Sequence, residues 1–77
     1  MNNVRRKELQ AIVNTLEEKR ETLEVLKEEE EEYRDNMPEN LHGSERYDIS
    51  SEAISDLELA LDSIDSAISY IEAAIGE

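Results

Sequence analysis

Residues 53–75 read AISDLELALDSIDSAISYIEAAI, and one apolar pattern repeats through them every seven residues. Each repeat opens with an alanine followed at once by isoleucine or leucine, and in the first three repeats another such residue stands three positions later. A seven-residue apolar repeat indicates a helix that packs along another helix. The alanines, whose small side chains let a neighbouring helix approach closely, are Ala53, Ala60, Ala67 and Ala74.

The preceding segment, residues 3–35, is predicted to form the other helix. It contains neither Gly nor Pro and is rich in Glu, Lys, Leu and Arg, which are good helix formers. Its own seven-residue repeat places Ile12, Leu26 and Tyr33 at one apolar position. The other apolar position holds three leucines, Leu9, Leu16 and Leu23. These two rows are the predicted buried face of the first helix.

A connection over residues 36–44 contains Pro38 and Gly43, which are typical of a turn. Ser44 is a candidate N-cap for a second helix over residues 45–75, with Asp48 or Ser50 as alternative later starts. Two helices of similar length with a short connection should fold back on each other. The predicted fold class is therefore all-α, an antiparallel two-helix hairpin (coiled coil) that forms a single domain.

The two repeats align in a register that places Glu30 opposite Ser50 and Lys19 opposite Leu61. The same register puts the three apolar residues of the first helix in the core, where Ile12, Leu26 and Tyr33 face in turn Ile68, Ile54 and Tyr47. One edge of the hairpin then brings cations and anions together, namely Arg6, Arg20, Lys27 and Arg34 with Glu58, Asp65 and Glu72. Such exposed pairs select register and orientation more than they stabilise.

The other edge is lined by small side chains, and we expect another helix to dock there. Two hairpins joined at this edge form a four-helix bundle, which is the common solution for amphipathic hairpins. A symmetric homodimer is the first expectation. A monomer, or a hairpin that awaits a different partner, is the alternative. The residues of this candidate dimer interface are Ala53, Ala60, Ala67, Ala74, Thr15 and Thr22.

The formal net charge is -13, and residues 47–77 contain no Lys or Arg. This charge disfavours direct binding of nucleic acid, whose phosphates require cations. It favours a protein partner with a basic surface. Acidic faces also keep small helical proteins soluble, which is the competing interpretation. The candidate partner-binding carboxylates on the outer face of the first helix are Glu17, Glu18, Glu21, Glu24, Glu28, Glu31 and Glu32.

Catalysis, cofactors and metals find little support in the residues. The chain has no cysteine, and a short helical rod offers no evident pocket in which a carboxylate is desolvated. Glu39 and His42 match the Glu-x-x-His spacing of di-iron bundles, but Pro38 and Gly43 place them in a turn rather than inside a helix. Consecutive glutamates at 28–32 point in different directions and do not converge on one calcium ion.

The connection is denser in apolar and hydrogen-bonding side chains than a linker requires. It is either a packed cap that closes the end of the rod or a recognition tip, because loops on rigid scaffolds often carry binding. The candidate recognition residues are Asn36, Pro38, Glu39, Asn40, Leu41, Glu45 and Arg46.

The run NMPENLHGSERY at residues 36–47, followed by an acidic helix rich in Ala, Leu and Ile, resembles a group of small helical proteins. Phages and mobile elements of Gram-positive bacteria encode them, and in them a pattern like N-x-P-E-N-L-x-x-S-E-R-Y joins two coiled-coil helices. The resemblance implies a helical hairpin and brings no settled activity. Residues 48–51 depart from the Glu- and Ala-rich start typical of the second helix in this group.

The functional hypothesis is a non-enzymatic interaction protein of phage or mobile-element origin that binds a host protein and inhibits or modulates it, in one version as a nucleic-acid mimic. The alternative is a self-assembling coiled-coil scaffold or oligomerisation module. No stretch approaches the roughly 18 apolar residues of a membrane span, and no apolar run follows the basic N-terminal residues. We therefore expect a cytoplasmic protein, in the host cell if it is phage-encoded.

Overall fold

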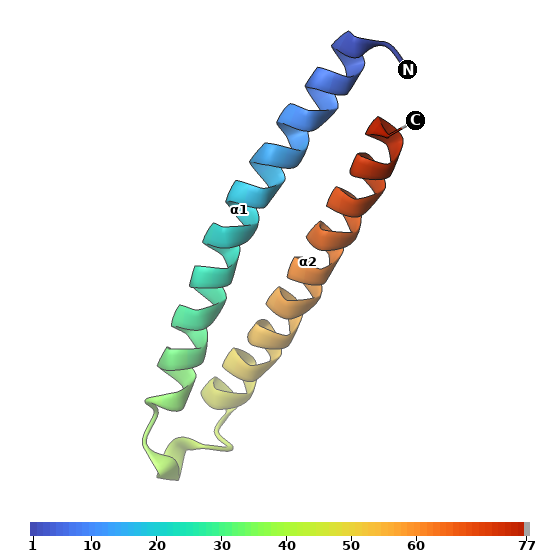
Figure 1. Ribbon diagram of the computed structural model, residues 1–77. Coiled ribbons are helices and arrows are strands. Elements are labelled where there is room, and N and C mark those ends of the chain that lie inside the picture. The colour runs from blue at the N-terminus through green and yellow to red at the C-terminus, as the bar shows by residue number, and fades with distance from the viewer. Residues whose placement is uncertain (77) are drawn as a thin grey trace.

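The computed structural model describes residues 1–76, which form two long helices that run side by side in opposite directions (Figure 1). Helix α1 spans Asn3–Asp35 and helix α2 spans Glu45–Ile75. A short 3-10 helix, η1, spans Glu39–Leu41 within the connection. The molecule is a rod with extents of 59 × 15 × 12 Å. The antiparallel two-helix hairpin predicted from the two repeats is confirmed.

Side-chain caps begin both helices. The Asn2 side chain accepts a hydrogen bond from the Arg5 backbone N–H at 2.8 Å. The Ser44 hydroxyl accepts one from the Tyr47 backbone N–H at 3.2 Å. Such bonds satisfy N–H groups that have no partner inside the helix. Gly43, directly before the second cap, has φ of 100°, a conformation that costs glycine little. The turn and the cap together determine where α2 begins.

Two contacts between the helices fix their register. The Ser50 hydroxyl donates to the Glu30 carboxylate at 2.6 Å, and Ser50 is buried. At the open end of the hairpin, Arg6 Nε donates to the Ile75 carbonyl at 3.2 Å. Glu30 therefore faces Ser50, as the alignment of the two repeats predicted.

The buried face of α1 differs from the predicted one. Val13 is 1% exposed and belongs to the core with three residues of α2, Ile54, Leu61 and Ile68. Ile12, Leu26 and Tyr33 are 49%, 52% and 47% exposed. The prediction that these three side chains fill the core opposite α2 was wrong. Helix α1 is rotated about its axis, so the row that contains Val13 replaces the row that contains Ile12.

Charge explains this rotation. The row that contains Ile12 also carries Arg5 and Lys19, and burying it would bring both cations against the apolar face of α2. Lys19, a mismatch in the predicted alignment opposite Leu61, is exposed. The row that contains Val13 also carries cations, but those cations have carboxylates of α2 within reach. The rotation therefore leaves Arg5 and Lys19 exposed to solvent, and it places Arg20 and Lys27 beside carboxylates of α2.

The assignment of the buried face of α2 is testable with two leucines of the same helix. Leu61→Ala is expected to lower the free energy of unfolding by about 2–5 kcal/mol, because Leu61 is 5% exposed and its loss leaves a cavity. Leu59→Ala is the matched control at 64% exposed, with an expected change below about 0.5 kcal/mol. Urea unfolding followed by circular dichroism measures both. Equal losses would contradict the assignment.

Candidate partner-binding surfaces

One edge of the rod is held by ion pairs between the helices; we call it the charged edge, formed by Arg20, Lys27, Glu58 and Asp65. Arg20 contacts Asp65 through two nitrogens, and its Nη2 lies 3.1 Å from Asp65 Oδ2. Lys27 Nζ lies 3.8 Å from Glu58 Oε1. The sequence predicted that a row of cations on α1 meets a row of anions on α2 along one edge, and these two pairs confirm it. Two-point contact by an arginine fixes direction as well as distance, so this edge orients α1 against α2.

Each cation of the charged edge also binds a carboxylate one turn further along α1. Arg20 Nη1 lies 2.9 Å from Glu24, and Lys27 Nζ lies 3.1 Å from Glu31. The hydrogen bond to Asp65 raises the pKa of Arg20, and the hydrogen bond to Glu31 raises the pKa of Lys27. Both side chains are charged at neutral pH, where the pairs are formed. The contribution of the Lys27 pairs is lost as the pH rises through the raised pKa of Lys27.

The opposite side, which we call the open edge, is lined by Ile12, Leu26 and Tyr33 of α1 and by the alanine row of α2. The large apolar side chains are about half exposed, while the alanines Ala53, Ala60, Ala67 and Ala74 are partly buried. Thr15 and Thr22, predicted to flank the alanines, are exposed, and the Thr22 hydroxyl donates to the Glu18 carbonyl at 3.4 Å. Apolar surface therefore runs along one side of the hairpin without a covering element among residues 1–76.

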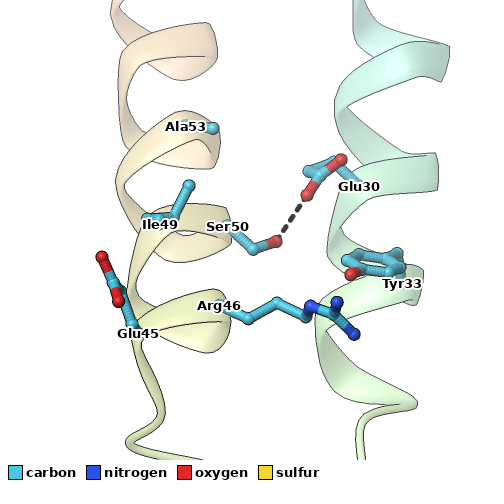
Figure 2. Close-up of a pocket in the computed structure, with 7 residues that line it drawn as sticks. All are labelled: Glu30, Tyr33, Glu45, Arg46, Ile49, Ser50 and Ala53. Carbon is cyan, nitrogen blue, oxygen red and sulfur yellow. Dashed lines mark hydrogen bonds between the residues drawn. The ribbon is translucent and has the colours of Figure 1, made fainter.

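The open edge deepens near the connection into a groove of about 440 Å³. Figure 2 shows Tyr33 on α1 across from Ile49 and Ala53 on α2, with the bond between Ser50 and Glu30 closing the space between the helices. Arg46 extends from α2 toward α1 in the same view and is exposed. The remaining lining residue is Glu45. The groove thus combines apolar side chains with the Arg46 cation and the carboxylates of Glu30 and Glu45.

The connection is a packed cap whose polar residues point outward. Met37 is buried, and His42 Nε2 lies 2.9 Å from the Met37 carbonyl. Because a carbonyl only accepts, the Nε2–H of His42 is the donor. The ring of His42 packs on Tyr47 with centroids 4.7 Å apart, and the Arg34 guanidinium lies 6.0 Å from that Tyr47 ring. These contacts give the tip a defined shape.

The predicted recognition residues of the tip are all exposed, so the cap interpretation and the recognition interpretation are compatible. They are Asn36, Pro38, Glu39, Asn40, Leu41, Glu45 and Arg46. His42 is occupied by its contacts with Met37 and Tyr47. Among residues 1–76, no cluster of three or more His, Asp or Glu side chains is arranged to hold a metal ion.

The seven glutamates predicted to bind a partner divide into two groups. Glu24 and Glu31 are partly buried and bind Arg20 and Lys27. The other five are exposed on the outer face of α1, and we call them the acidic face: Glu17, Glu18, Glu21, Glu28 and Glu32. Only these five remain available to a partner.

Two features escaped the sequence interpretation. The open edge carries large apolar side chains as well as alanines, and Ile49 adds to it from α2. The signal was present in Arg5 and Lys19, which share a row with Ile12 and argue against burying that row.

Comparison of the chain with protein-family models, with curated proteins and with solved structures gives no match. Among residues 1–76, no helix combines the length and the apolar character that crossing a membrane requires.

The orienting role of the charged edge predicts a charge-specific loss of stability. Asp65→Lys should lower the melting temperature, because it places a cation against Arg20, and the loss should shrink at high salt. The double variant with Arg20→Glu should recover part of the loss by reversing the pair. Thermal unfolding followed by circular dichroism is the measurement.

Asp62→Lys is the matched control for this test. It makes the same change of charge at an exposed residue of α2 that forms no ion pair within residues 1–76. It should cause no loss of melting temperature. An equal loss in both single variants, or no recovery in the double variant, would show that the edge does not orient the helices.

Proposed function

We propose that this chain is a non-enzymatic acidic interaction protein, which binds a basic surface of another protein through the acidic face and thereby inhibits or modulates that protein. The observation that carries the proposal is the separation of charge around α1. Arg20, Lys27 and Arg34 are engaged in ion pairs, and Arg6 donates to the end of α2. These four cations of α1 are therefore engaged away from the acidic face, and the exposed Lys19 is the remaining cation in the middle of the helix.

The spacing of these carboxylates suits a surface that normally holds nucleic acid. Five exposed glutamates lie between Glu17 and Glu32, a rise of about 22 Å at 1.5 Å per residue. The mean rise between successive charges is about 5.6 Å, against about 3.4 Å between phosphates along a DNA strand. A rigid helix keeps the charges in place, so binding does not have to order them. The exposed tip residues would add specificity to this electrostatic attraction.

The origin and location of the protein are part of the same proposal. The resemblance of residues 36–47 to the connection of small phage and mobile-element proteins supports an origin in such an element. Such a protein would act in the cytoplasm of the host cell, where proteins that bind nucleic acid offer basic surfaces.

A scaffold or oligomerisation module is the second candidate, and the open edge is the observation that favours it. We propose that two copies associate there as a homodimer and form a four-helix bundle. Half-exposed Ile12, Leu26 and Tyr33 would be covered in that arrangement. Dimerisation leaves the acidic face free, so the dimer is compatible with either function.

Affinity capture from a bacterial host lysate, followed by mass spectrometry, tests the proposed function. The test variant replaces exposed carboxylates of the acidic face by glutamine at Glu17, Glu21, Glu28 and Glu32. Glu30 and Glu31 stay unchanged, because they bind Ser50 and Lys27. This variant should capture roughly tenfold less, or still less, of a basic protein that the wild type retains. High salt should elute that protein from the wild type.

The control variant removes the same number of charges from exposed positions of α2, at Asp48, Glu52, Asp56 and Asp62. It should retain the partner. An equal loss in both variants would point to non-specific attraction, and the absence of any captured basic protein at low salt would contradict the proposal.

A further inference from the structure

The hairpin exposes more surface than a compact chain of its size. Its solvent-accessible area is 5691 Å², whereas a compact monomer of 8.9 kDa exposes about 4,800 Å². The excess of about 900 Å² is close to the roughly 800 Å² that each partner buries in a standard interface. One further association of ordinary size would therefore bring the chain to the exposure of a compact protein.

The two rows that line the open edge are symmetric about its middle. Ala60 lies at the centre of α2, with Ala53 and Ala67 spaced equally on either side. On α1 the corresponding centre is Lys19, with Ile12 and Leu26 spaced equally around it. The register set by Glu30 and Ser50 places these two centres at nearly the same height along the rod. A two-fold axis through the middle of the edge would then pair both rows at once.

The charges at the two ends of the rod select the direction of the second copy. Residues 1–7 contain three Lys or Arg and no Asp or Glu, and they lie at the open end of the hairpin, where Arg6 donates to the Ile75 carbonyl. Residues 28–35 contain six Asp or Glu and one Arg, and they lie near the connection. A parallel pair would bring the two acidic ends together, whereas an antiparallel pair sets each basic end beside an acidic end.

We infer that a second copy of this chain covers the open edge in antiparallel orientation, with the two-fold axis beside Ala60. The alanine rows of the two α2 helices face each other, so that Ala53 of one copy lies beside Ala67 of the other. Ile12 likewise meets Leu26 of the other copy, and Arg5 lies beside the other copy's Tyr33. This inference rests on the dimer proposed above and adds its direction and register.

Lys19 lies at the axis, where it meets its own counterpart. Its exposed side chain can lay the methylene stem over the apolar row while the ammonium group reaches water at the side of the bundle. Repulsion between the two ammonium groups weakens the dimer without changing its direction. The alanines on α2 offset this by letting the helices approach closely.

Disulfide trapping tests the orientation, because the chain contains no cysteine of its own. Ala53→Cys and Ala67→Cys are oxidised separately and as a mixture of two chains that differ in mass by a tag. In the antiparallel dimer each cysteine lies about 21 Å from its own counterpart, beyond the roughly 7 Å limit between bridged Cα atoms. Only the mixture should therefore give a covalent dimer. Ala60→Cys should cross-link to itself.

Light scattering of the wild type separates the two ways in which the inference can fail. A mass near 8.9 kDa at micromolar concentration would overturn the dimer and the orientation together. A dimeric mass without the bond between positions 53 and 67 would overturn the orientation alone. Ala60→Leu should shift the wild-type dimer to monomer by overpacking the interface, while Ser55→Leu, on the far side of α2, should leave it dimeric. Equal behaviour of these two variants also overturns the inference.

Discussion

The charged edge determines which face of α1 meets α2. Arg20 binds the Asp65 carboxylate through two nitrogens, and Lys27 lies between Glu31 and Glu58. To reach the carboxylates of α2, the row that contains both cations must turn toward that helix. It carries Val13 into the core, and the neighbouring row turns outward. Ion pairs at a surface add little stability, but here they decide between two apolar rows that burial alone would not distinguish.

The same rotation divides the outside of the rod into surfaces with different chemistry. Arg20 and Lys27 are held at the charged edge, so neither of these cations neutralises the acidic face. On the other side, the displaced apolar row and the alanine row form the open edge. A rigid cap joins these surfaces at the tip, where His42 closes on Met37. One constraint thus creates both a charged surface for a partner and an apolar surface for a second copy.

The two repeats, the caps and the turn residues were sufficient to predict the hairpin. Local signals determine these features, since Ser44 caps α2 through its own backbone and Gly43 supplies the turn. The meeting of the row that contains Arg20 with the row that contains Asp65 was predicted as well, because it follows from spacing. The rotation of α1 was not predicted, because Ile12 and Leu26 favour burial as strongly as Val13 does and the opposing signal of Arg5 and Lys19 was not weighed against them. The identity of a partner cannot be predicted from the sequence, since negative charge attracts basic surfaces in general rather than one protein.

Methyl-to-methyl nuclear Overhauser effects test the rotation of α1 most directly. In a chain with labelled Ile, Leu and Val methyl groups, diluted with unlabelled chain to suppress contacts between copies, Val13 should show cross-peaks to core residues of α2 such as Ile68. Ile12 should show none to the same residues. Strong cross-peaks from Ile12 to Ile68, with Val13 lacking them, would contradict the account, because the row that contains Ile12 would then be the buried one.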